Sequence, residues 1–200
     1  MKNFLNLALL FFTIGCSETN SLNVPLMKEN IYFNDFENDD KQFWTGNDGL
    51  QEATIEKGKY YFRSLDNKER FNAIPINLNY LNDFILEVSV AGPASDNDKY
   101  YGILFGDFTG KEDFLYFEVT NLGKFRIFDH HLIIDGKLPG ISSKGFKKLT
   151  IQKKENEAKY YINEKYIYSY PVPKWKDFRA GVSTGNALLL WMDYFSIKKN

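Results

Sequence analysis

Hydrophobic and polar residues alternate along most of the chain with a period of two, which is typical of half-buried β-strands. In residues 83–90, for example, the alternation places Phe84, Leu86, Val88 and Val90 on one face. No long segment has helical periodicity, so we expect an all-β, two-sheet antiparallel jelly-roll sandwich. Similar runs, separated by Gly, Asn, Asp and Pro, predict further strands near 31–36, 51–57, 59–65, 70–76, 100–107, 113–120, 124–129, 146–154, 158–163, 165–170, 178–184 and 187–198.

One hairpin can be given a register from its sequence. Residues 121–123 (Asn-Leu-Gly) are typical of a three-residue turn in which Gly takes the positive φ. Pairing the flanking strands places Glu118 opposite Arg126, and Tyr116 opposite Phe128. The other face of the hairpin is then wholly apolar. A slip of one residue would mix the two faces, so the sorting supports this register.

A second hairpin is expected to pair residues 149–151 with residues 160–162, with its turn near residues 155–156. A tighter turn at residues 163–164 then leads into the next strand. Glu164 stands where Gly is common after Asn, which leaves the type of this turn open.

Composition agrees with a single β-rich domain. The chain has 200 residues, of which 44% are hydrophobic and 17% aromatic (Phe 18, Tyr 13, Trp 3). Aromatic side chains suit pleated, half-buried surfaces, and we expect Phe84, Phe105, Phe117, Phe125 and Tyr160 in the core. The net charge of −1 argues against nucleic acid as a partner. A single Cys excludes a disulfide framework.

The N-terminus has the pattern of a bacterial export signal. Lys2 precedes a mostly apolar stretch that is too short to span a bilayer and ends at Gly15-Cys16. This ending resembles the lipobox of bacterial lipoproteins, in which the Cys becomes the lipidated first residue. Thr13 departs from the aliphatic residue that is usual at that position. The resemblance implies a signal peptide over 1–15 and acylation, including palmitate, on Cys16.

The same resemblance implies a place for the protein. Residues 16–28 would form a tether, residues 29–200 the β-sandwich domain, and the N-terminal lipid would bind the membrane. Asp is absent directly after Cys16, which by likeness to lipoproteins of two-membrane bacteria favours the outer membrane over the inner. We therefore expect a lipid-anchored protein of the bacterial cell envelope.

Several short fragments follow one another in a recognisable order. They are Phe33-Asn34-Asp35-Phe36 before Trp44, Gly58-Lys59-Tyr60-Tyr61-Phe62, Tyr101-Gly102-Ile103-Leu104-Phe105-Gly106, Tyr160-Tyr161-Ile162-Asn163 and Asp193-Tyr194-Phe195-Ser196-Ile197. Together they resemble the concanavalin A-like lectin/glucanase superfamily, and within it LamG-like jelly rolls and a domain of unknown function grouped with 3-keto-glycoside hydrolases. The resemblance implies two antiparallel sheets, one of them concave, with carbohydrate bound on the concave face or at its loop edge.

The first hairpin supplies the candidate ligand-binding residues: Tyr116, Glu118, Arg126 and Phe128. Rings that stack on sugar faces, beside charged groups that hydrogen-bond hydroxyls, are what a glycan site needs. The alternative is an exposed Glu118–Arg126 cross-strand pair beside an ordinary stabilising aromatic pair.

The sequence contains little evidence for a catalytic site, and no catalytic residue is assigned. The chain lacks the Glu-x-Asp-x-Glu run of the related jelly-roll glucanases. Glu87 and Glu118 are lone acids on separate strands. The two histidines, His130 and His131, are neighbours that point to opposite faces of a strand, and they are expected to cap a hairpin end.

No cofactor is required by these patterns, but a structural calcium ion is one reading of the acidic residues. In a jelly roll the first and last strands often pair, which would bring Asp35 or Glu37 near Asp193. Carboxylate oxygens are the ligands that Ca²⁺ prefers. The alternative is an ordinary acidic loop over residues 35–40.

Three functions remain open from the sequence. The favoured one is a non-catalytic module that binds a glycan or an envelope protein. The second is a glycoside hydrolase of the same superfamily. The third is a purely structural or accessory envelope lipoprotein. An acid pair facing one groove would favour the hydrolase, and an aromatic-lined face without such a pair would favour the binding module.

Overall fold

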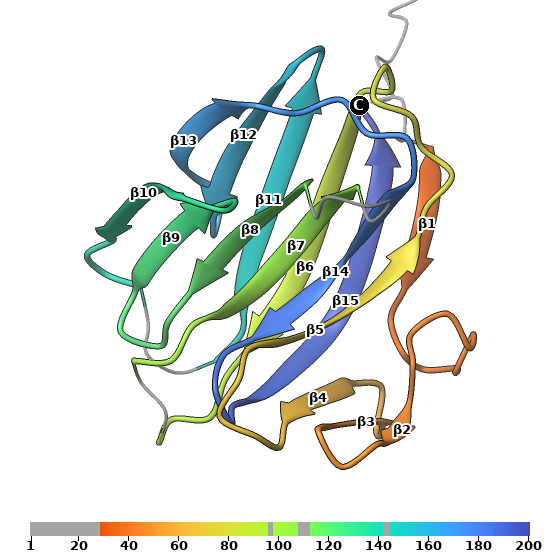
Figure 1. Cartoon of the computed structure of the whole chain (residues 1–200), viewed down its shortest axis with the longest axis vertical. Helices are drawn as coiled ribbons and strands as arrows, with labels where there is room; N and C mark the ends of the chain where they lie inside the picture. The colour runs from red at the N-terminus through yellow and green to blue at the C-terminus, as the bar shows by residue number, and fades with distance from the viewer. Residues whose placement is uncertain (1–28, 96–97, 108–112, 142–144) are drawn as a thin grey trace, which may run out of the picture.

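A computed structural model of the chain describes residues 29–95, 98–107, 113–141 and 145–200. The predicted signal peptide, Cys16 and the tether lie outside these residues. The described strands form two antiparallel sheets packed face to face, as the alternating pattern predicted (Figure 1). No helix among them is long and apolar enough to cross a membrane.

The larger sheet has the order β13-β12-β11-β6-β15-β4-β3-β2, with β1 also paired to β15. Its strands are β1 (Asn30–Asn34), β2 (Gly46–Asn47), β3 (Gln51–Ile55), β4 (Tyr60–Ser64), β6 (Phe84–Ala91), β11 (Lys147–Lys154), β12 (Glu157–Ile162), β13 (Lys165–Pro171) and β15 (Leu189–Lys199). We call it the large sheet.

The second sheet has the order β10-β9-β8-β7-β14-β5. Its strands are β5 (Arg70–Pro75), β7 (Tyr101–Asp107), β8 (Asp113–Val119), β9 (Lys124–Phe128), β10 (Leu132–Lys137) and β14 (Phe178–Thr184). We call it the small sheet, and the face turned away from the large sheet is its outer face.

The core lies between the two sheets and is built from the inward residues of each strand. The rings expected there, Phe84, Phe105, Phe117, Phe125 and Tyr160, are all buried. Phe117 of the small sheet meets Tyr160 of the large sheet edge to face, with ring centroids 5.2 Å apart. Burial of a large apolar side chain contributes about 1.5–3 kcal/mol, so this layer holds the sheets together.

Both predicted hairpin registers are confirmed. Glu118 pairs with Arg126 and Tyr116 with Phe128, while residues 149–151 pair with residues 160–162. In the tight turn that follows β12, Asn163 and Glu164 have φ values of 47° and 67°. Two successive positive φ values are typical of a type I′ turn, which settles the type that the sequence left open.

One strand of useful length was not predicted. β10 contains three successive apolar residues, Leu132 to Ile134, followed by Asp135 and Gly136, so it has no alternating pattern. It forms the edge of the small sheet, where neither face is fully covered, and its side chains are exposed or half-buried. Ile133 and Ile134 pack against the core only in part, and the register of β10 with β9 shifts between Leu132 and Ile134, so the strand carries no regular alternation.

The two ends of the sandwich are distinct. β1 begins next to the C-terminus, where the amide of Lys199 donates to the carbonyl of Glu29 at 2.9 Å. This is the upper end in Figure 1. The connection from β14 to β15 lies at the opposite, lower end (Figure 1). The described chain therefore starts at one end of the sandwich, and the residues that follow β14 lie at the other.

Candidate functional site

The four candidate residues meet on the outer face of the small sheet. Tyr116 and Glu118 come from β8, and Arg126 and Phe128 come from the neighbouring β9. Their neighbours in sequence point into the core, since Phe117 is fully buried. Alternation along the two strands therefore brings the four side chains together, as the sequence predicted.

Glu118 is fully buried, although the alternative reading expected an exposed ion pair. Its side chain is 0% exposed, and its carboxylate accepts hydrogen bonds from Arg126 Nε at 2.7 Å and Ser183 Oγ at 2.7 Å. Arg126 Nη2 lies 2.5 Å from the same carboxylate. A buried carboxylate needs such partners, because it has left its hydration shell.

A glycine makes the contact with Ser183 possible. Gly102 of β7 stands directly between Glu118 of β8 and Ser183 of β14 in the strand register. With no side chain at Gly102, the Glu118 carboxylate crosses β7 to reach the hydroxyl. A Cβ at Gly102 would lie 2.1 Å from the carbonyl oxygen of Phe117, which is too close for any other residue.

The Arg126 guanidinium is also held by aromatic rings. Its Cζ lies 4.3 Å from the ring centroid of Tyr100 and 4.5 Å from that of Phe128. Phe128 in turn stacks on Tyr116, with centroids 4.5 Å apart and ring planes 5° apart. The rings therefore pack on one another and on Arg126, so less of their surface is available to a sugar than the sequence-based hypothesis assumed.

A second carboxyl group, which the sequence did not single out, completes the cluster. Glu69 lies just before β5, and its carboxylate accepts a hydrogen bond from Arg126 Nη2 at 3.0 Å. Burial, and after it the charge of Glu118 and a hydrogen bond shared with Glu118, raise the pKa of Glu69, while Arg126 lowers it; the net pKa is about 8. At neutral pH, Glu69 is therefore mostly protonated beside the carboxylate of Glu118.

These groups border a hollow at the lower end of the small sheet. We call it the Arg126 hollow; its volume is about 320 Å³, and it is lined by Glu69, Asp98, Lys99, Tyr100, Arg126, Gly185 and Asn186. The Arg126 side chain is 29% exposed here and that of Glu69 34%. Among the described residues, Arg126 Nη1 has no hydrogen-bond partner, so two N–H groups are available to a ligand.

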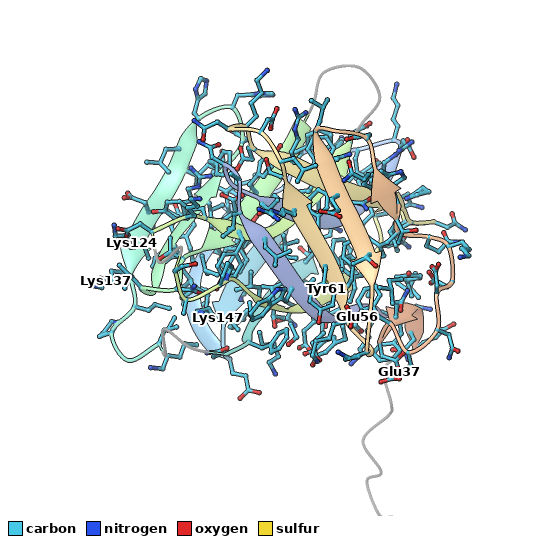
Figure 2. All side chains as sticks on the ribbon, turned by 90° about the horizontal axis from the view of Figure 1, so that it is seen from below. Glu37, Glu56, Tyr61, Lys124, Lys137 and Lys147 are labelled. Carbon is cyan, nitrogen blue, oxygen red and sulfur yellow. The ribbon has the colours of Figure 1, made fainter. Side chains whose placement is uncertain are left out.

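The acidic residues considered for calcium lie elsewhere. β1 pairs with β15, as expected for first and last strands, but Asp193 binds Lys59 Nζ at 2.6 Å. Asp35 accepts a hydrogen bond from the Glu37 amide at 3.2 Å. Glu37 lies on the opposite side of the molecule from Lys124, the first residue of the strand β9 that carries Arg126 (Figure 2). No group of three metal-ligating side chains forms among the described residues, and calcium stays a prediction from the sequence.

The remaining candidates are separated from this cluster. Glu87 lies in the large sheet and accepts a hydrogen bond from the Tyr194 hydroxyl at 2.7 Å, so it does not pair with Glu118. His130 and His131 are exposed in the turn between β9 and β10, where the Asp129 amide donates to the His131 carbonyl at 3.1 Å. This agrees with their expected place at a hairpin end.

Comparison with solved structures places the fold. The β-glucanase of Bacillus licheniformis matches with a TM-score of 0.59 at 10% identity, over 84% of this chain and 98% of that chain. A protein of unknown function with a galectin-like fold from Bacillus subtilis matches with a TM-score of 0.64 at 10% identity, over 86% and 96%.

The catalytic domain of an endo-1,3-β-glucanase (laminarinase) from Thermotoga petrophila matches with a TM-score of 0.63 at 10% identity, over 87% of this chain and 99% of that domain. No protein-family model matches the sequence, and no curated protein is significantly similar to it. The chain thus shares the jelly-roll sandwich fold of these glucanases and of the galectin-like protein.

Proposed function

We propose that this protein is a glycan-binding module of the bacterial cell envelope, with its ligand seated at the Arg126 hollow. The observation that carries the proposal is the fixed position of the Arg126 guanidinium. It is held by the buried Glu118 and by the ring of Tyr100, it lines the hollow, and its Nη1 has no hydrogen-bond partner in the part of the chain that the structure describes. A donor fixed in advance loses little conformational entropy when a ligand binds.

The lining of the hollow suits sugar hydroxyls, which both donate and accept hydrogen bonds. Arg126 offers N–H donors, and the carboxyl of Glu69 and the amide of Asn186 offer acceptors and further donors. Because ring surface in this region is partly covered by other rings, recognition rests on these hydrogen bonds more than on stacking.

The proposed location is compatible with this site. A tether over 16–28, with its lipid on Cys16, would join the domain where β1 approaches, at the upper end in Figure 1. The Arg126 hollow lies at the lower end, beside Gly185 and Asn186. An anchored domain would therefore present the hollow at the end that is remote from its tether.

The test is binding of the mature protein, in detergent, to an array of envelope and plant polysaccharides. Arg126→Lys keeps a positive charge next to Glu118 but lacks the planar fork of donors, so we expect affinity to fall about tenfold or more. Arg63→Lys changes an exposed arginine of the large sheet and should leave binding unchanged. Absence of binding to every glycan by the wild type would overturn the proposal.

Glycoside hydrolysis is the second candidate, and one observation favours it. Glu69 and Glu118 are neighbouring carboxyl groups, and the raised pKa of Glu69 suits a general acid at neutral pH. The burial of Glu118 opposes this reading, because both its oxygens are bound and none of its side chain is exposed to a sugar. Release of reducing ends by the wild type, and its loss in Glu69→Gln, would favour the hydrolase.

A further inference from the structure

The strand β11 carries two buried lysines at inward positions, one near each end of the strand. Lys147 lies at the lower end of the sandwich, the end that Figure 2 shows from below, and Lys153 lies toward the upper end. The amine of Lys153 is 3.6 Å from the carboxylate of Asp83. Lys147 forms no ion pair with any residue that the structure describes, so its amine lies in the core without a counter-ion.

The Lys147 amine donates hydrogen bonds to two polar groups that come from outside the large sheet. Its Nζ lies 3.0 Å from the hydroxyl of Tyr101 in β7 and 3.3 Å from Oδ1 of Asn121 in the turn after β8. The Tyr101 hydroxyl itself donates to the same Asn121 oxygen at 2.7 Å. The three side chains therefore form a buried network that joins the large sheet to the small sheet.

The network also holds the connection between β6 and β7. Nδ2 of Asn121 donates to the carbonyl oxygens of Gly92 at 3.2 Å and Pro93 at 2.7 Å, where this connection leaves β6. At its other end the connection enters β7 at Tyr101, directly after Tyr100. The described residues of the connection, 92–95 and 98–100, are thus held by Asn121 at one end and by Tyr101 at the other.

This connection supplies one wall of the Arg126 hollow. The ring centroid of Tyr100 lies 4.3 Å from Cζ of Arg126, and the carbonyl of Tyr100 accepts a hydrogen bond from the amide of Gly185 at 2.9 Å. Tyr100 and Gly185 both line the hollow. Successive side chains of a strand point to opposite faces, so the Tyr101 ring that is fixed in the core sets the backbone from which Tyr100 reaches Arg126.

Stability alone does not explain a lysine at position 147. A buried amine has left its hydration shell, and replacement of buried charged groups by apolar residues of similar size is often neutral or stabilising. Burial also lowers the pKa of Lys147, because water favours the charged form. What the amine adds is a set of N–H donors, which no apolar residue supplies.

We infer that Lys147 is a positioning residue of the Arg126 hollow, because its hydrogen bonds to Tyr101 and Asn121 hold the chain that places Tyr100 against Arg126. The inference rests on the proposed function and adds to it a residue from the opposite sheet. Lys147 does not line the hollow, so it acts through its two partners and not by contact with the ligand. Loss of its donors should therefore lower the affinity for glycan without lowering the stability of the fold.

Lys147→Met tests this, since Met keeps the apolar stem of the side chain and lacks the donors. For the mature protein in detergent, we expect affinity for the glycan that the array identifies to fall about fivefold. The free energy of unfolding in urea should equal or exceed that of the wild type. Lys153→Met is the matched control, because it removes a buried lysine of the same strand that donates to the Asn82 carbonyl, outside the network; affinity should be unchanged. An equal loss of affinity in both variants would overturn the inference.

Hydrogen exchange at the Gly185 amide reports on the same wall without any glycan. The exchange should be at least threefold faster in Lys147→Met than in the wild type, and unchanged in Lys153→Met. Tyr101→Phe, which keeps the ring and removes the hydroxyl, should have the same effect, and the double variant should exchange no faster than either single variant. Unchanged exchange in Lys147→Met would overturn the inference. Faster exchange in a protein that binds no glycan would overturn the proposed function and leave the positioning role standing.

Discussion

The hydroxyl of Ser183 donates a hydrogen bond to the carboxylate of Glu118 at 2.7 Å, across the intervening strand β7. The contact joins two strands that are not neighbours, and it exists because Gly102 leaves the space between them empty. Its consequence reaches the surface of the molecule. Glu118 is fixed by Ser183 on one side, and it in turn fixes the guanidinium of Arg126 that borders the hollow.

Removal of Arg126 should destabilise the fold as well as the site. Arg126→Ala leaves the buried carboxylate of Glu118 without its cation, and loss of one partner of a buried pair costs about 3 kcal/mol. Urea denaturation measures this as a drop in the free energy of unfolding. The double variant Glu118→Gln with Arg126→Ala has no buried charge and should recover part of the loss. Strictly additive effects would show that the two side chains are not coupled.

Gly102 should tolerate no side chain. In Gly102→Ala, the new Cβ would meet the Phe117 carbonyl, so we expect a loss of about 2 kcal/mol or more in the free energy of unfolding. Gly49→Ala serves as the comparison, since nothing lies within 4 Å of its Cβ position and only its φ of 82° opposes the change. That penalty is about 1 kcal/mol. A Gly102→Ala protein as stable as Gly49→Ala would contradict the proposed packing.

A substitution in the turn at Asn163 and Glu164 should raise the thermal stability of the protein. Glu164 has a φ of 67°, which costs a non-glycine residue about 1 kcal/mol. Glu164→Gly removes that cost but also removes the ion pair between Glu164 and Lys148 at 2.8 Å. The Glu164 side chain is 80% exposed, so this ion pair contributes little to stability. The expected result is a melting temperature a few degrees higher. Glu164→Gln, which loses the pair and keeps the strain, should show no gain.

Local patterns predicted most of the fold. The register of β8 with β9 followed from residues on either side of one short turn, because the apolar and polar faces could be sorted in only one way. β10 was missed because an edge strand with both faces partly open has no such sorting. Pairing of β1 with β15 was expected only from the family resemblance, since nothing in the two segments themselves encodes it.

The site was predicted only in its local part. Glu118 and Arg126 are eight residues apart in one hairpin. In contrast, Glu69 is 57 positions from Arg126 in the chain, and Ser183 is 65 positions from Glu118. Such contacts are set by the strand order of the small sheet and by the missing side chain at Gly102. A single acid before a strand, such as Glu69, has no sequence feature that distinguishes it from the other surface acids.

The lipid anchor remains a prediction from the sequence and can be tested directly. Cells fed a palmitate analogue that carries a clickable group should label the wild-type protein, because Cys16 is the only cysteine in the chain and would be the acylated N-terminus. Cys16→Ser should not be labelled and should leave the membrane fraction. Ser17→Ala is the matched control and should behave as the wild type. Label that persists in Cys16→Ser would refute the anchor.

The protonation of Glu69 should make both the free energy of unfolding and the affinity for glycan depend on pH. Burial raises the pKa of Glu69 in the folded protein from its ordinary value of 4.5 to about 8. The folded state therefore favours the protonated form, and this contribution to stability is complete below about pH 4.5 and is lost as the pH rises toward 8. Glu69→Gln, which resembles the neutral acid at every pH, should lack this dependence.

Two measurements check this pH dependence. Carbon NMR of the Glu69 carboxyl should give a midpoint well above pH 6, and a midpoint near 4.5 would contradict the buried carboxyl pair. The free energy of unfolding of the wild type should fall relative to that of Glu69→Gln between pH 5 and pH 8.5. Arg126 contacts both carboxyl groups, so an ionised Glu69 would bind more strongly to the same guanidinium that the ligand would contact. Glycan binding should therefore weaken above pH 8 in the wild type and not in Glu69→Gln.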